Sequence, residues 1–244
     1  MAGMGARDRL IVALDVPTVD AARALVGKLG DAVGFYKIGL ELAMCGGLDL
    51  ARELALNRKR VFLDMKLLDI ENTVERATRN AAAAGATFLT VHAHDAKTLR
   101  AAAAGKAGTG LKILGVTVLT NLTADDVRQQ GIDASPPDLV ARRATLARHA
   151  GCDGVVASGL EAARVRAAVG RQMVIVTPGI RLPGDAAGDQ ARIATPEQAI
   201  ADGADYLVVG RPIAAARDPL GAAATFAQAI DAGLAVRDAR SQRE

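Results

Sequence analysis

The stretch VFLDMKLLDIENTVERATRNAAAAG, residues 61–85, joins a short apolar run to an alanine-rich segment with helical spacing. The run at 61–66 is apolar and starts with a β-branched residue, which is typical of a buried strand. The segment 73–85 starts with a threonine and closes at a glycine, as helices commonly do. The stretch therefore predicts one strand followed by one helix.

This strand–helix unit recurs along the whole chain. Short apolar runs alternate with helix-like stretches such as those at 18–30 and 195–203. The eight strand candidates are LIVALD (10–15), FYKIG (35–39), VFLDMK (61–66), TFLTVH (87–92), KILGVTV (112–118), DGVVAS (153–158), MVIVTP (173–178) and DYLVVG (205–210).

Alternation of this kind implies parallel strands joined by right-handed crossovers, and hence an α/β fold. Eight units in 244 residues match a single (β/α)8 TIM barrel, which typically has about 250 residues. A doubly wound open sheet is the rival, but it more often has a Gly-rich GxGxxG turn after its first strand, where this chain has ALDVPT. We predict one barrel domain over residues 1–244, with the Gly/Asp-rich segment 182–190 as a long loop.

Composition limits the possible functions. Hydrophobic residues make up 50% of the chain and aromatic residues 2%, which predicts an aliphatic, alanine-rich core. The net charge of +3 is scattered, so nucleic-acid binding is not expected. Two distant cysteines, no signal peptide and no 18-residue apolar run predict a soluble cytoplasmic protein that does not bind a membrane.

Charged residues gather where the predicted strands end. Asp15 ends the first strand, Lys37 lies on the second, and Asp64 and Lys66 end the third, with Asp69 in the loop that follows. Catalytic groups of such barrels lie at this end. Because side chains alternate along a strand, Asp64 and Lys66 share a face and are expected to point into the barrel mouth, as is Lys37.

Two interpretations of these charges remain open. They could form a salt-bridge network that closes the top of the barrel, or they could be acid–base groups of an active site. Burying charge is costly unless partners compensate for it, and charged groups clustered in a cleft are usually functional. The density of the cluster favours an active site.

A second signal lies after the seventh and eighth strands. The segments PGIR and VVGRPI supply Gly179, Arg181, Gly210 and Arg211 where barrels commonly bind phosphate. Glycines permit close backbone approach, and arginines can form paired hydrogen bonds to phosphate oxygens. The alternative is two turn glycines with solvated arginines.

The segment HAHD (92–95) has a spacing that could place two metal ligands on one face. No further ligand cluster accompanies it, so the sequence does not favour a catalytic metal, and no metal or organic cofactor is predicted.

Seven segments together resemble the orotidine 5′-phosphate decarboxylase family. They are ALD, YKIG, DMKLLDIENT, TVLT, TPGIR, AGDQARIATPEQAI and VVGRPI, in family order from Asp15 to about Pro219. The most specific motif is D-x-K-x-x-D-I-x-N-T at 64–73. The chain departs from the family pattern at Glu71, where Pro is common, at Asn121, where Ser is common, and in HAHDAK, which replaces a glycine-richer segment.

The resemblance implies a catalytic network of Lys37, Asp64, Lys66 and Asp69. The family converts orotidine 5′-phosphate to uridine 5′-phosphate and CO2 in pyrimidine biosynthesis, without a metal or cofactor. Lys66 is then expected to stabilise the carbanion at C6 and to protonate it. The family forms homodimers, so Asp69 and Thr73 are expected to reach into the neighbouring subunit's site.

The resemblance also implies the substrate-binding residues. Asp15 and Lys37 are expected to hold the ribose hydroxyls, and Thr120 belongs to the loop that contacts the pyrimidine. The expected phosphate-binding residues are Arg181, Gln190, Gly210 and Arg211, with Gln190 bridging phosphate and base.

Two rival functions remain. Sugar-phosphate enzymes of the same superfamily share the D-x-K-x-x-D strand but use Mg²⁺ and carry Glu in place of Lys37. The other rival is a phosphate-ligand-binding barrel without catalysis, which would have no use for so costly a charged cluster.

Overall fold

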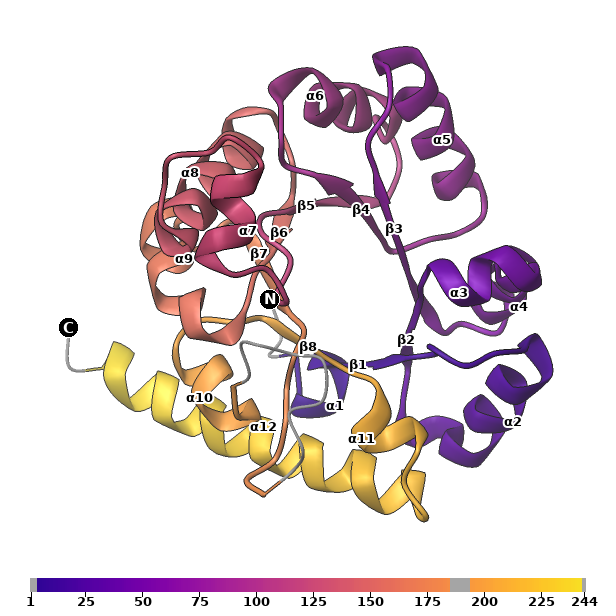
Figure 1. Ribbon diagram of the computed structural model, residues 1–244. Helices are drawn as coiled ribbons and strands as arrows, with labels where there is room; N and C mark the ends of the chain where they lie inside the picture. The colour runs from indigo at the N-terminus through magenta and orange to yellow at the C-terminus, as the bar shows by residue number, and fades with distance from the viewer. Residues whose placement is uncertain (1–3, 185–193, 243–244) are drawn as a thin grey trace.

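Eight parallel strands follow one another in chain order around a closed barrel (Figure 1). The computed structural model describes residues 4–184 and 194–242. The strands are β1 (Leu10–Ala13), β2 (Phe35–Ile38), β3 (Arg60–Leu67), β4 (Phe88–His92), β5 (Lys112–Val116), β6 (Gly154–Val156), β7 (Val174–Thr177) and β8 (Tyr206–Val209). Pairing of Leu10 with Leu207 joins β1 to β8 and closes the barrel. The predicted fold class is confirmed, and each strand lies within its predicted range except β3, which extends one residue beyond it at each end.

Helices form the outer ring of the barrel (Figure 1). Those longer than one turn are α2 (Val19–Leu29), α4 (Leu48–Leu56), α5 (Glu71–Ala83), α6 (Ala96–Gly105), α7 (Ala124–Gln129), α8 (Pro136–His149), α9 (Ala162–Val169), α10 (Pro196–Ala201) and α12 (Pro219–Ser241). Short helical segments are α1 (Ala6–Arg9), α3 (Leu40–Leu42) and α11 (Arg211–Ala214). A kinked segment, Ala43–Gly47, joins α3 to α4, and the backbone of Cys45 and Gly46 within it is not helical.

Side-chain caps begin several of these helices as the sequence predicts. Thr18 Oγ1 accepts a hydrogen bond from Ala21 N at the start of α2, and Thr195 caps α10 in the same way. The prediction is wrong for α5, which begins two residues before Thr73, at Glu71, with Ile70 preceding it. Glutamate suits this first position because its charge complements the positive end of the helix dipole. Proline suits the same position for another reason, its fixed φ.

The barrel interior is more aromatic than the composition predicts. Phe35, Phe62, Phe88 and Tyr206 pack together inside the barrel, with ring centroids 5.1–5.9 Å apart. The guanidinium of Arg60 lies 4.5 Å from the centre of the Phe35 ring. The layer between strands and helices is mainly aliphatic, as expected, and holds the other two aromatic residues, Tyr36 and Phe226. Four of the six aromatic residues thus fill the barrel below the charged mouth.

The regular alternation predicted for β3 does not extend to its end. The pairing register with β4 shifts between Leu63 and Leu67, and Lys66 has a φ of +49°. A left-handed backbone at a residue with a Cβ costs of the order of 1–3 kcal/mol. Its surroundings must therefore hold Lys66 in this conformation.

The last helix, α12, is long and apolar enough to span a bilayer by length and composition alone. It lies along the outside of the barrel beside α10 and α11 (Figure 1), and buries Phe226 and Ile230. Its apolar character therefore serves at least partly to cover the barrel.

Candidate active site

A cavity of about 690 Å³ opens at the C-terminal ends of the strands. Its lining includes the predicted Asp15, Lys37, Asp64 and Lys66, together with Phe62 from the top of the aromatic layer. The volume falls in the range of about 300–1,000 Å³ typical of small-molecule sites. The prediction that Lys37, Asp64 and Lys66 point into the barrel mouth is confirmed, and Asp15, predicted at the end of the first strand, lines the same cavity.

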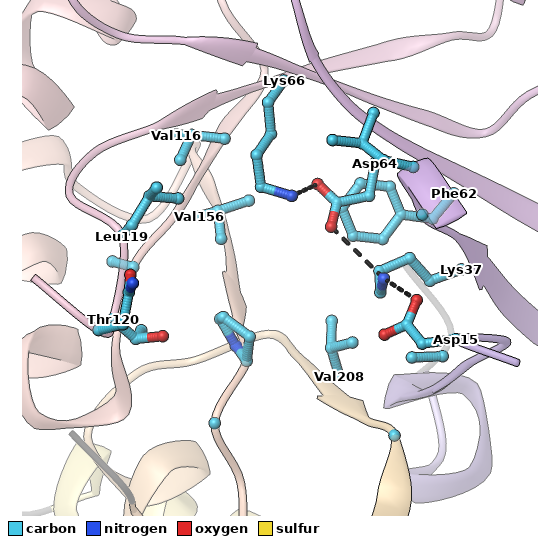
Figure 2. A pocket seen from close by; sticks show the side chains of 18 of the residues that line it. Asp15, Lys37, Phe62, Asp64, Lys66, Val116, Leu119, Thr120, Val156 and Val208 are labelled. Carbon is cyan, nitrogen blue, oxygen red and sulfur yellow. Dashed lines mark hydrogen bonds and ion pairs between the residues drawn. The ribbon is translucent and has the colours of Figure 1, made fainter. Parts of the chain in front are cut away.

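The four charged residues form one continuous chain of ion pairs (Figure 2). Lys37 Nζ lies 2.8 Å from Asp15 Oδ1 and 3.5 Å from Asp64 Oδ2. Lys66 Nζ lies 2.9 Å from the other oxygen of Asp64, Oδ1. Two ammonium groups and two carboxylates therefore alternate along one side of the cavity, and their formal charges cancel.

Asp64 is the centre of this chain. Burial alone would raise the pKa of its carboxyl, but the ammonium groups of Lys37 and Lys66 outweigh burial and lower that pKa below the ordinary 3.8. Asp64 is therefore ionised at neutral pH and holds both lysines.

Gly39 lies against the ion pair between Asp15 and Lys37. A Cβ on Gly39 would lie 2.8 Å from Asp15 Oδ1 and 3.0 Å from Lys37 Nζ. Real Cβ atoms are essentially never found closer than 3.0 Å to another heavy atom. Gly39 therefore leaves room for the ion pair between Asp15 and Lys37.

The predicted phosphate-binding residues line the same cavity. Gly179, Arg181, Gly210 and Arg211 all contribute to its wall. Gly179 has a φ of +74°, a left-handed conformation that favours glycine. Arg181 is buried, and its Nη1 donates a hydrogen bond of 2.8 Å to its neighbouring carbonyl, Ile180 O. Gln190 lies outside the described residues.

Thr120 and Asn121 line the cavity from the segment that follows β5. Figure 2 shows Leu119 and Thr120 on the opposite side of the cavity from Asp15 and Lys37. A planar ligand in the cavity would therefore lie between this segment and the charged chain.

Asp69 and Thr73 are exposed and are absent from the cavity lining. Asp69 Oδ1 accepts a hydrogen bond of 2.6 Å from Ile70 N in the turn before α5. Leu68 and Ile70, on either side of Asp69, are 51% and 73% exposed. The expected contribution of Asp69 and Thr73 to a neighbouring subunit's site stays a prediction.

The HAHD segment ends β4 beside the charged chain. The rings of His92 and His94 lie against each other with centroids 4.6 Å apart and planes tilted by 32°. Burial, His94 and Lys66 lower the pKa of His92 to about 4, with a further lowering from Arg143 and an opposing effect of Asp64. Within residues 4–184 and 194–242, no group of three or more His, Cys, Asp or Glu side chains is arranged to hold a metal.

Sequence reasoning missed three supporting residues. They are Gly39, Thr90 and the buried Arg143, whose Nη1 donates a 2.8 Å hydrogen bond to Thr117 O. Thr90 had a signal, because strand alternation places it on the same face as the interior residue Phe88. A buried arginine on α8 had none.

A closed barrel whose cavity and charged chain lie at the C-terminal strand ends has the architecture of the (β/α)8-barrel enzymes. The chain belongs to the orotidine 5′-phosphate decarboxylase / HUMPS family, whose model matches residues 8–226. The family resemblance predicted from the sequence is confirmed.

Curated relatives agree with this assignment over nearly the whole chain. A protein of Rhodopseudomonas palustris (strain BisB5) named orotidine 5′-phosphate decarboxylase is 56% identical over 217 residues, 89% of this chain and 92% of the relative. A protein of the same name from Afipia carboxidovorans is 54% identical over 230 residues, 94% of this chain and 96% of the relative.

Solved structures show the same barrel. The crystal structure of orotidine 5′-phosphate decarboxylase from Lactobacillus acidophilus matches with a TM-score of 0.81 at 35% identity, over 91% of this chain and 98% of that one. An uncharacterized conserved protein from Geobacillus kaustophilus matches with a TM-score of 0.79 at 31% identity, over 91% and 99%.

Proposed function

We propose that this chain decarboxylates orotidine 5′-phosphate to uridine 5′-phosphate and CO2, a step of pyrimidine biosynthesis in the cytoplasm. The observation that carries the proposal is the ion-paired chain of Asp15, Lys37, Asp64 and Lys66 inside the cavity. Family membership and relatives of that name at 54–56% identity support it.

In this mechanism the ion-paired residues of the cavity stabilise a negative charge that develops during the reaction. When the bond from C6 to the carboxylate breaks, CO2 leaves and the electron pair stays on C6 in the plane of the ring, where no π system can absorb it. The ammonium of Lys66 stabilises this pair electrostatically and then donates its proton to C6. Asp64 keeps Lys66 charged and in place through the 2.9 Å ion pair. The neutral amine finally regains a proton from water.

The remaining cavity residues supply binding. Arg181 and Arg211, which line the cavity with Gly179 and Gly210, are expected to bind the phosphate, and Thr120 is expected to contact the base. Asp15 and Lys37 hold the ribose hydroxyls. Binding energy from the distant phosphate holds the ring against the charged chain.

We also propose a homodimer with shared sites. Exposed apolar side chains follow two neighbouring strands: Leu40, Met44 and Leu48 after β2, and Leu68 and Ile70 after β3. Exposed apolar residues grouped beside a site are typical of an interface. A second copy docked here would cover them and bring Asp69 and Thr73 to the neighbouring cavity.

The family description also covers the HUMPS enzymes, which are among the sugar-phosphate enzymes named above as a rival. Family membership alone therefore does not decide which reaction this chain catalyses. Lys37 favours decarboxylation of orotidylate, because its ammonium occupies the space between Asp15 and Asp64. A divalent cation at these carboxylates would be repelled by that charge.

The test is turnover of orotidine 5′-phosphate by the wild type and by Lys66→Ala. Lys66→Ala is expected to abolish turnover while binding of uridine 5′-phosphate stays largely intact, because the phosphate end is unchanged. Lys97→Ala, at an exposed position on α6, is the matched control and is expected to keep full activity. Comparable turnover in Lys66→Ala would overturn the role given to the lysine.

The dimer has its own test. Mixing inactive Lys66→Ala and Asp69→Ala chains is expected to restore some activity, because one site of each mixed dimer then has both residues. Mixed dimers confirmed by mass spectrometry but without activity would place Asp69 in its own subunit's site.

A further inference from the structure

We propose that Thr90 is a positioning residue that fixes the backbone of Lys66 and the carboxylate of Asp64 with one hydroxyl group. This inference rests on the proposed function, because it assigns Thr90 a part in placing the lysine that protonates C6. Thr90 itself lies on β4, fully buried, and is absent from the cavity lining.

The hydroxyl of Thr90 makes two hydrogen bonds at once. Its oxygen accepts a bond of 2.9 Å from the backbone N–H of Lys66. Its proton is donated to Asp64 Oδ1 at 3.0 Å. The same Asp64 oxygen is 2.9 Å from Lys66 Nζ. Thr90, Asp64 and Lys66 therefore form a closed ring that holds the lysine at both its backbone and its ammonium group.

This ring explains how Lys66 keeps an unfavourable backbone conformation. Lys66 has a φ of +49° and lies where the pairing of β3 with β4 shifts register. A bulge of this kind takes an amide out of the regular ladder and re-aims the side chain. The Thr90 oxygen accepts the hydrogen bond of this displaced N–H, so the partly buried amide keeps a partner outside the regular ladder.

Substrate binding and the placement of Lys66 then depend on different residues. Phosphate-directed binding depends on the opposite loops, so loss of the Thr90 hydroxyl is expected to reduce kcat with little change in KM. Misplacing a reacting group by about 1 Å can reduce the rate about a hundredfold. Asp64 also loses one of the hydrogen bonds that favour its ionised form.

The decisive variant is Thr90→Val, which keeps the shape and removes the hydroxyl. Its kcat is expected to fall at least about tenfold while KM stays within about threefold of the wild type. Thr90→Ser restores the hydroxyl and is expected to recover most of kcat. The control is Thr78→Val, the same change at a fully buried threonine elsewhere, on α5. It is expected to leave kcat unchanged.

Three results would overturn the proposal: normal kcat in Thr90→Val, an equal loss in Thr90→Ser, or an equal loss in Thr78→Val. If Thr90→Val fails to fold, Thr90→Ser and Thr90→Ala give the same contrast, because only serine keeps the hydroxyl. Equal kcat in that pair would also overturn it.

A second readout does not depend on the reaction. Hydrogen exchange of the Lys66 amide, followed by NMR, is expected to be at least about tenfold faster in Thr90→Val than in the wild type. Unchanged exchange would refute the positioning role even if orotidylate is turned over. Faster exchange in a protein whose wild type does not turn over orotidylate would refute the proposed reaction and leave the Thr90 contact standing.

Discussion

Replacing Asp64 by asparagine removes the charge that holds two lysines and keeps the size of the side chain. In the structure, Lys66 Nζ is 2.9 Å and Lys37 Nζ is 3.5 Å from the two Asp64 oxygens. Lys37 keeps a second partner in Asp15 at 2.8 Å. For Lys66, no other ion pair is found within the described part of the chain. The change therefore affects Lys66 most.

The size of the effect follows from burial. Removing one partner of a buried ion pair costs about 3–5 kcal/mol. The side chain of Asp64 is 15% exposed but that of Lys66 is 28% exposed, so water compensates in part. We expect Asp64→Asn to lower the free energy of unfolding by about 2–3 kcal/mol and to lower kcat severely.

Urea unfolding at neutral pH, followed by circular dichroism, measures the stability change. Asp31→Asn is the matched control, because Asp31 pairs with Lys59 at 3.2 Å with its own side chain fully exposed. Exposed pairs contribute about 0–1 kcal/mol. Equal, small losses in both variants would refute the reasoning that Asp64 holds the lysines against burial.

Three further outcomes are expected. Gly39→Ala places a Cβ 3.0 Å from Lys37 Nζ, so it is expected to raise KM for orotidylate and lower kcat, measured by steady-state kinetics. Arg143→Met removes the 2.8 Å bond to Thr117 O and is expected to destabilise the fold by about 2 kcal/mol in urea unfolding. Burial, His94 and Lys66 lower the folded pKa of His92 from 6.5 to about 4, so only the unfolded chain takes up this proton between those values. Stability is therefore expected to fall as pH drops from 6.5 to 4, by less than about 3 kcal/mol because His92 is only half-buried, and His92→Gln is expected to flatten that decline in thermal melts.

Each expectation has a contrary result. Wild-type kinetics in Gly39→Ala would mean that the ion pair moves aside freely. Wild-type stability in Arg143→Met would mean that Thr117 O finds another donor. An unchanged pH profile in His92→Gln would assign the decline to other titrating groups.

The fold could be predicted because eight short apolar runs alternate with segments whose apolar residues have helical spacing. Parallel strands follow from that alternation. Lys37 and Asp64 could be placed at the barrel mouth because side chains on a regular strand alternate between its two faces. This alternation can be read from the sequence of the strand alone. The left-handed backbone of Lys66 could not be predicted, since it arises where β3 and β4 lose register. That shift depends on pairing between two strands rather than on either segment alone.

Other parts of the site depend on neighbours that local sequence patterns do not identify. The contacts of Thr90 and the closeness of Gly39 to Asp15 appear only when separate strands are brought together. Asp69 and Thr73 belong to a conspicuous motif, yet they do not line the cavity of their own chain. Their predicted role requires a second subunit.

The most direct test of the central claim is conversion of orotidine 5′-phosphate by the purified wild type after exhaustive EDTA treatment, without added cofactor. The loss of substrate absorbance and the formation of uridine 5′-phosphate are measured together. The account predicts rapid conversion under these conditions. No conversion, with activity on a sugar phosphate only after Mg²⁺ is restored, would contradict it and place the chain with the metal-dependent members of the superfamily.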